Sequence, residues 1–306
     1  MKRVVVVGNA TVDVIQQVDR FARTGESVLC NTIMVCAGGK GLNQALAAAR
    51  TGALTQLHAP VGADAHCELL ARAVALEPGL QAHWLTVLAP TDISTIWIDV
   101  AGDNMIVSAA AAADAMDPAH AAAACDALGI GDVLLIQGNL SQEATKAAIA
   151  QAYVRGAQVV LNTAPMRSWM AALLADVDVV IANKVEAAEL SGDSDEPEAA
   201  LLRAGAHAVV ITLGGDGAVV ATQAGRLQVA APMVTVLDTS GAGDVLAGTI
   251  AGLLARGIPI EAALRVAVAA ASISVTQAGT TPSFPSRDAI AALCEAQAVR
   301  LGPVNA

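Results

Sequence analysis

Runs of apolar residues recur along the chain at intervals that fit buried strands of a parallel sheet. Each run is short and is followed by glycine or a polar residue, as at 4–7, 57–61, 133–137, 159–162, 177–182 and 209–213. Ala-rich segments between the runs predict helices at 40–50, at 65–75 and from about residues 141, 167, 185 and 198. Strands that alternate with helices at this spacing imply right-handed crossovers. The pattern therefore predicts an α/β fold, with a doubly wound, mostly parallel sheet and helices on both faces.

Two early segments break this pattern and predict a second, smaller sheet. Polar and apolar residues alternate within about 11–36 and 92–112, and the turn Gly102-Asp103-Asn104 predicts a β-hairpin in the second segment. We expect the two segments to form a lid over the crevice at the strand ends, where ligands bind in such folds. Residues 1–306 are then one α/β domain that carries a β-sheet lid.

The stretch 234–255 contains the most specific chemistry. Val234 to Leu237 is apolar and predicts a buried strand, and Val245 to Ala255 predicts a buried helix. The residues between them are Asp238-Thr239-Ser240-Gly241-Ala242-Gly243-Asp244. Glycines let the backbone approach a ligand closely, and the first N–H groups of a helix have no partner within it, so this turn predicts an anion site suited to phosphate.

Asp244 is unusual at such a site, because a carboxylate repels phosphate. A carboxylate there is useful if it accepts a proton during a phosphate transfer. The alternative is that Asp244 only complements the positive end of the helix dipole.

Three further motifs each allow two interpretations. Gly39-Lys40-Gly41 lacks the spacing of a P-loop, and it predicts either a ligand contact or a tight turn with a surface lysine. Asn183 and Glu186 either supply oxygen donors for a hydrated magnesium ion or cap a helix. The Gly-rich residues 214–217 either border a nucleotide or form a hairpin.

Composition removes several classes of function. The net charge of −11 argues against a nucleic-acid partner and against an anionic membrane surface, although backbone N–H groups and magnesium can still bind phosphate. No apolar stretch is long enough to span a membrane. The five cysteines form no zinc or redox motif, so we expect free thiols in the reducing cytoplasm. The absence of G-x-S-x-G leaves a hydrolase triad without support.

Two motifs together resemble the signatures of the ribokinase-like (PfkB) carbohydrate kinases. They are Gly39-Lys40-Gly41-Leu42-Asn43-Gln44-Ala45 and the turn 238–244, in this order and about 200 residues apart. Supporting stretches at 8–13, 161–165, 183–186, 211–217 and 269–285 extend the resemblance over nearly the whole chain. The resemblance implies transfer of the γ-phosphoryl group of ATP to a primary hydroxyl of a free sugar.

The resemblance also implies a role for each matching residue. Asp244 would be the catalytic base, beside an anion hole of Gly241, Ala242 and Gly243. The sugar hydroxyls would contact Asp13, Gly39, Lys40 and Asn43. Magnesium and the phosphates would be organised by Asn183 and Glu186. The nucleotide would be lined by Thr212, Gly214 and Gly217. A potassium ion would bind at Asp238, Ser240, Ser274, Gln277, Gly279 and Ser283.

The chain departs from the family pattern at three places. Asn139 stands where ribokinases have a glutamate that contacts the sugar, and residues 110–113 are alanines where a Gly-Ala-Asn segment is usual. These changes predict a modified sugar pocket in which ribose is not the best substrate. Val268 replaces an asparagine near the adenine, which predicts a less polar contact with ATP.

Two other functions remain open at this point. A nucleoside or sugar-phosphate kinase of the same family would need aromatic residues or additional Arg and Lys near the sugar, and both are scarce. A catalytically silent sugar-binding protein would not need the intact Asp244. We also expect a homodimer that pairs through the lid, because a small exposed sheet has edges and an apolar face to cover.

Overall fold

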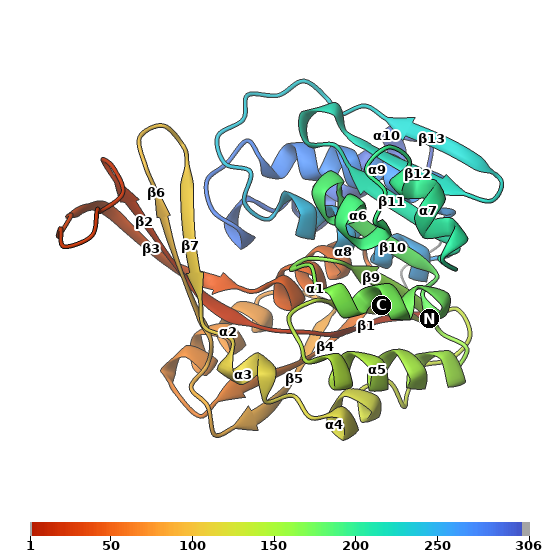
Figure 1. Cartoon of the computed structure of the whole chain (residues 1–306), viewed down its shortest axis with the longest axis horizontal. Coiled ribbons are helices and arrows are strands. Elements are labelled where there is room, and N and C mark those ends of the chain that lie inside the picture. The colour runs from red at the N-terminus through yellow and green to blue at the C-terminus, as the bar shows by residue number, and fades with distance from the viewer. Residues whose placement is uncertain (1, 302–306) are drawn as a thin grey trace.

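The computed structural model of the chain describes residues 2–301 (Figure 1). Within this range, nine strands form the main sheet in the order β13-β12-β11-β10-β9-β8-β1-β4-β5. Strands β1, β4, β5 and β8 to β11 are parallel to their neighbours, and the hairpin β12–β13 adds to one edge in antiparallel register. Their bounds are β1 Arg3–Val7, β4 Leu54–Gly62, β5 Leu80–Val87, β8 Val133–Gln137, β9 Gln158–Asn162, β10 Val179–Asn183, β11 Ala208–Thr212, β12 Ala218–Thr222 and β13 Gly225–Val229.

Helices cover both faces of this sheet, because each central strand buries side chains on both sides. Val4 and Val6 of β1 pack into one core cluster, and Val5 and Val7 pack into the other. The first face carries α1 Lys40–Arg50, α2 Ala65–Ala75, α8 Ala242–Ala255 and α9 Ile260–Ser274. The second face carries α3 Ala111–Asp114, α4 Pro118–Ala123, α5 Gln142–Val154, η1 Ser168–Asp176, α6 Lys184–Ser191 and α7 Pro197–Arg203. Helix α10 Arg287–Ala296 packs against α9.

The strand order reverses beside β1. From β1 the chain proceeds to β4 and β5 on one side, and it returns to β8 on the other side before continuing to β11. Ligands bind outside the carboxyl ends of parallel strands at such a switch point. Here that position lies beyond Val7 of β1 and Gln137 of β8, so the topology places a site next to residues 8–9 and 138–139.

A separate four-stranded sheet projects from the body at this end of the molecule (Figure 1). Its order is β3-β2-β6-β7, formed by β2 Thr11–Val18, β3 Cys30–Gly38, β6 Ile93–Ile98 and β7 Asn104–Ser108. The two segments expected to form the lid therefore do pair with each other. The edge strands keep apolar side chains in solvent, with Ile33 of β3 60% exposed and Val107 of β7 69% exposed.

Helices α1 and α8 lie against each other with very little space between them. A Cβ atom at Gly248 would lie 2.3 Å from the carbonyl oxygen of Gln44, and one at Gly252 would lie 2.4 Å from Oγ1 of Thr51. Only glycine permits this approach, so the small residues of α8 set the separation of the two helices. Both helices begin at the same end of the sheet, and their first turns therefore meet there.

Three expectations about secondary structure need correction. Val234 to Leu237 is not a buried strand: it is an exposed, irregular segment, and Val234 and Val236 border a cavity instead of entering the core. Strand β5 was not predicted, because residues 80–87 mix apolar side chains with polar and histidine side chains at this edge of the main sheet. The helix expected from about Arg167 is the 3₁₀ helix η1. Residues 214–233, which the sequence predicts as a small β excursion, contribute β12 and β13 to the main sheet.

Within residues 2–301, no helix combines the length and the apolar character needed to cross a membrane. That residues 1–306 form one domain stays a prediction, and residues 1 and 302–306 lie outside the described part.

Candidate active site

The turn before α8 has the geometry of an anion site. Gly241 caps the helix in the left-handed conformation, with φ of 79°. A side chain there would also collide with the ring of Phe284, 2.7 Å from the Cβ position. Helix α8 begins at Ala242, so the N–H groups of Gly243 and Asp244 belong to its first turn and have no preceding turn to bond. The predicted anion site is thus the start of a long buried helix, although an irregular segment and not a strand leads into it.

Asp244 is buried, with 5% of its surface exposed, and the first turn of α1 faces it. Asn43 Nδ2 donates to Asp244 Oδ2 over 3.0 Å, and Gln44 Nε2 donates to Oδ1 over 2.9 Å. Lys40 Nζ lies 3.9 Å from Oδ1. The two motifs that are about 200 residues apart in the sequence therefore meet at one carboxylate.

A pair of fully buried glutamines supports this arrangement. Gln44 and Gln137 have no exposed surface. Gln137 Nε2 donates to Gln44 Oε1 over 2.9 Å, and Gln44 Nε2 also donates to Asn162 Oδ1 over 3.0 Å. Sequence reasoning gave neither glutamine a role. The sequence did contain a signal for Gln44, which is a polar residue among the alanines of a buried helix. A buried polar side chain in such a position requires hydrogen-bond partners.

Asp13 is the second buried carboxylate at this site, with 4% of its surface exposed. It accepts hydrogen bonds from Thr11 Oγ1 over 2.8 Å and from Thr280 Oγ1 over 3.3 Å. A Cβ atom at Gly38 would lie 2.0 Å from Asp13 Oδ2, so glycine is needed there. Burial raises the pKa of Asp13; the hydrogen bonds from Thr11 and Thr280 oppose this effect, and the charge of Asp244 adds to it.

Amide oxygens at this end of the sheet remain available for a ligand. Oδ1 of Asn43, Oε1 of Gln137 and Oδ1 of Asn139 are buried and have no hydrogen-bond partner among the described residues. A buried acceptor without a partner costs about 1–3 kcal/mol. Hydroxyl groups are the donors that would satisfy such acceptors, so the free oxygens fit a ligand that is rich in hydroxyls.

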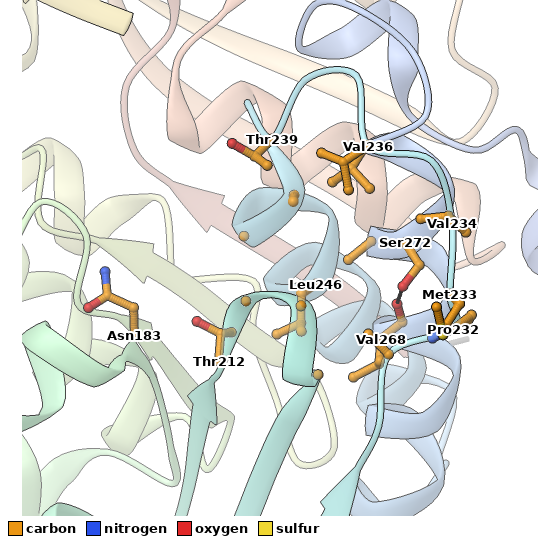
Figure 2. Close-up of a pocket in the computed structure, with 18 residues that line it drawn as sticks. Asn183, Thr212, Pro232, Met233, Val234, Val236, Thr239, Leu246, Val268 and Ser272 are labelled. Atoms are coloured by element: carbon orange, nitrogen blue, oxygen red, sulfur yellow. Dashed lines mark hydrogen bonds between the residues drawn. The ribbon is translucent and has the colours of Figure 1, made fainter. Parts of the chain in front are cut away.

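A cavity of about 750 Å³ opens beside the start of α8. Figure 2 shows Asn183 and Thr212 on one side, Pro232, Met233 and Val268 on the other, and Leu246 between them. Ala242 and Gly243 of the anion turn also line this cavity. The predicted nucleotide residues that it contains are Asn183, Thr212, Gly214, Gly217 and Val268.

Glu186 does not line the cavity, and it forms a capping box with Asn183. Asn183 Oδ1 accepts from the Glu186 N–H over 2.8 Å, while Glu186 Oε2 accepts from the Asn183 N–H and from Thr163 Oγ1, each over 3.0 Å. The capping interpretation of this pair is therefore confirmed. Asn183 also borders the cavity, so a role toward magnesium stays a prediction. No group of three or more His, Cys, Asp or Glu side chains within residues 2–301 forms a metal site.

Asp238 connects the anion turn to the loop after α9. Its Oδ1 accepts from the Ser240 N–H and its Oδ2 from the Gly279 N–H, each over 2.8 Å. Ser283 Oγ donates to the Thr280 carbonyl in the same loop, and Ser274 Oγ donates to the Ala271 carbonyl at the end of α9. Gln277 is exposed. Carboxylate and carbonyl oxygens of this kind fit a hard cation, and Asp238, Ser240 and Gly279 are the predicted ligands that direct contacts bring together.

The site combines four features: a helix start suited to an anion, a buried carboxylate beside it, amide oxygens that can accept from ligand hydroxyls, and a cavity of about 750 Å³. Together they define the site of a phosphotransferase on an α/β fold. The pfkB family carbohydrate kinase model matches residues 1–287. Ribokinase from Bacillus subtilis is 32% identical over 293 residues, which cover 95% of this chain and 98% of that protein. The bifunctional ribokinase/ribose-5-phosphate isomerase A from Fructilactobacillus sanfranciscensis is 32% identical over 306 residues, and this chain spans 56% of its length.

A solved structure agrees with these relatives. Arabidopsis thaliana ribokinase complexed with ribose and ATP superposes with a TM-score of 0.84 at 26% identity, over 96% of this chain and 99% of that one. The chain belongs to the pfkB family of carbohydrate kinases. It is accordingly a phosphotransferase that acts on a sugar hydroxyl, which confirms the expected fold class, family and type of reaction.

Proposed function

We propose that the chain transfers the γ-phosphoryl group of ATP to a primary hydroxyl of a free sugar, with Asp244 as the base. The observation that carries this proposal is the position of Asp244. It is buried in the first turn of α8, beside an anion turn that also borders the 750 Å³ cavity. A carboxylate in this place can accept the hydroxyl proton next to the point where the phosphoryl group arrives.

The residues of this chain then divide the reaction between them. Asp13, Gly39, Asn43 and Asn139 orient the sugar through carboxylate, backbone and amide groups. Asn43 and Gln44 hold both oxygens of Asp244 in place. The N–H groups of Gly241, Ala242 and Gly243 would stabilise the negative charge on the moving phosphoryl group. The Ala242 N–H donates to the Thr239 carbonyl over 3.3 Å and would have to turn from it. Lys40 contributes a positive charge close to Asp244.

The nucleotide is proposed to occupy the cavity in Figure 2. Thr212, Gly214 and Gly217 border it on one side, and Val268 gives the adenine an apolar contact. Asn183 and Glu186 would organise a magnesium ion at the phosphates, where the ion would supply charge neutralisation. Glu186 would do so from its capping position, since it does not line the cavity.

A potassium ion is proposed at Asp238, Ser240, Ser274, Gln277, Gly279 and Ser283. The support is the double role of Asp238, which holds the N–H groups of Ser240 and Gly279 at once. A cation there would fix the anion turn against the loop. Equal rates in sodium and potassium buffers would remove this part of the proposal.

The substrate class is a free pentose or a related ketose. The Bacillus subtilis relative is a ribokinase, and the structure of the Arabidopsis thaliana ribokinase contains ribose and ATP. Ribose is therefore a candidate, but Asn139 supplies a neutral amide that both donates and accepts. We predict that a sugar with a different hydroxyl pattern exceeds ribose in kcat/KM.

The proposal extends to assembly and location. A homodimer through the lid is supported by the exposed apolar residues of the edge strands β3 and β7, namely Ile33, Val35, Ile106 and Val107. All five cysteines are free thiols, which supports a location in the reducing cytoplasm.

The test is a panel of pentoses, hexoses, nucleosides and sugar phosphates, in which ADP release from ATP is measured with and without each acceptor. Acceptor-dependent release with a free sugar supports the proposal. A preference for a nucleoside or a sugar phosphate would replace the substrate class. Sugar binding by calorimetry without any ADP release would identify a silent sugar-binding protein instead.

A further inference from the structure

Thr280 contacts both halves of the proposed site. It lies between Gly279 and the short helix η3 Thr281–Ser283, and 6% of its surface is exposed. Its Oγ1 donates to Asp13 Oδ2 over 3.3 Å. Its Cα lies 3.6 Å from the position that a Cβ atom would take at Gly241. Thr280 therefore contacts the buried carboxylate of Asp13 with its side chain, and its backbone lies beside the anion turn.

The loop that carries Thr280 is fixed to its surroundings at three other points. Gly279 donates its N–H to Asp238, the same carboxylate that holds Ser240 of the anion turn. Thr281 Oγ1 donates to the Ala37 carbonyl at the end of the lid strand β3 over 3.1 Å. Arg50 Nη1 donates to the Phe284 carbonyl over 2.9 Å, at the far end of the loop. A displacement of Thr280 is thus shared with the anion turn and with the base of the lid.

Asp13 accepts hydrogen bonds from two threonine hydroxyls that come from different parts of the chain, and Ser94 of β6 is a further side-chain partner. Thr11 belongs to the same strand as Asp13, β2, so its hydrogen bond connects Asp13 only to the base of the lid. Thr280 approaches from a loop 267 residues further along the chain. A sugar hydroxyl that donates to Asp13 fixes the carboxylate, and the bond to Thr280 carries that constraint to the loop that Asp238 holds against the anion turn.

We propose that the Thr280 hydroxyl couples the two substrates: a sugar bound at Asp13 raises the affinity of the anion turn for the nucleotide phosphates. By linkage, bound nucleotide raises the affinity for the sugar by the same factor. Thr280 is a positioning residue in this account, because it acts through Asp13 and through the bond of its neighbour Gly279 to Asp238. The inference rests on the proposed function, in which Asp13 holds the sugar and the α8 turn holds the phosphates.

The experiment measures the Kd of the non-hydrolysable analogue β,γ-imido-ATP by calorimetry, with and without a saturating amount of the best sugar from the panel. The wild-type chain is expected to show a coupling factor of about 5 or more, the lower end of the usual range. Thr280→Val removes the hydroxyl at nearly constant volume and should bring the factor to about 1. Thr280→Ser keeps the hydroxyl and should restore coupling. Thr280→Ala repeats the measurement should valine disturb packing.

Thr11→Val is the matched control, because it removes the other hydroxyl that donates to Asp13. It should weaken sugar binding by about 10-fold, the loss typical of a hydrogen bond to a charged group, and leave the coupling factor unchanged.

The possible outcomes distinguish a failure of this inference from a failure of the proposed function. Wild-type coupling in Thr280→Val, or equal loss of coupling in Thr280→Val and Thr11→Val, overturns the role of Thr280. Turnover of a sugar by the wild type without coupling overturns the inference alone. If no sugar is phosphorylated, the proposed function fails, and the inference fails with it.

Discussion

At the scale of single residues, Asp244 offers the sharpest test of the chemistry. Asp244→Asn keeps the size of the side chain but cannot accept a proton, so kcat should fall by about 10²–10⁴-fold. Affinity for sugar and nucleotide should change far less than kcat, although only one of the two donors, Asn43 or Gln44, keeps an oxygen acceptor in this variant. Calorimetry and kcat on the same variant check this.

The competing interpretation, in which Asp244 only complements the helix dipole, expects a different result for this variant. Under that interpretation, kcat stays near the wild-type value and the free energy of unfolding falls by about 0.3–1 kcal/mol. A variant that retained about half of the wild-type rate would contradict the proposed mechanism, in which loss of the base costs at least about 10²-fold.

Asp13 yields a prediction about stability and pH. Because burial raises its pKa, the native state holds the proton more tightly than the unfolded state does. The associated stability is present below the pKa of an unfolded aspartate and is lost as the pH rises through the raised native value. Above that raised value, the ionised carboxylate therefore destabilises the protein relative to its protonated form.

Asp13→Asn should accordingly raise Tm at pH 7 by about 1.5 °C for each roughly 1 kcal/mol relieved. The advantage should shrink as the pH is lowered through the raised pKa of Asp13, and sugar affinity should fall at the same time. Thermal unfolding over a pH series checks the sign. A variant that is less stable than the wild type at pH 7, yet equally stable in acid, would contradict it.

At the scale of elements, the sequence predicted the helices that build the site but not what connects them. The Gly-rich turns and the apolar runs after them predicted both α1 and α8. The contact of Gln44 with Asp244, and of Thr280 with Asp13, depends on how helices and loops pack, which the residue pattern does not record. Val234 to Leu237 shows the opposite failure. An apolar run indicates a strand only when it is buried, and here it borders a cavity.

The contact between α1 and α8 gives a prediction that links packing to catalysis. Gly248→Val places a Cβ atom where the Gln44 carbonyl lies 2.3 Å away, so the helices must separate. We expect a loss of about 1–3 kcal/mol in unfolding free energy, typical of overpacking. The kcat value should also fall, because Gln44 and Asn43 move away from Asp244.

Gly129→Ala is the stability control for this prediction, because the nearest atom to its Cβ position is 4.0 Å away and its backbone needs no positive φ. Urea unfolding of both variants gives the comparison. If Gly248→Val kept the wild-type stability and rate, the close approach of the helices would have no role in holding the site.

At the scale of the whole molecule, topology explains why the site could be placed before its contacts were known. Strand order reverses beside β1, and the candidate residues follow β1, β8, β9 and β10 at their carboxyl ends or begin helices there. The alternation of short apolar runs and helices was enough to predict such an edge. Strand β5 escaped prediction because it lies at the edge of the sheet, and His83, Trp84 and Leu85 on it are only half-buried.

The lid has a further consequence at this scale. Its outer strands β3 and β7 have unpaired edges and exposed apolar side chains, among them Ile33 and Val107. Pairing with the lid of a second copy would cover both features, and twofold symmetry is the commonest way to do so. We therefore predict a dimer by light scattering at micromolar concentration.

The double variant Ile33→Lys with Val107→Lys should be monomeric, because lysines in the contact would have to lose their hydration. Leu76→Lys, which changes an 85% exposed leucine just after α2 and outside the four lid strands, should remain dimeric. A monomeric wild type would contradict the prediction, and so would a double variant that stays dimeric, since the contact would then lie elsewhere on the molecule.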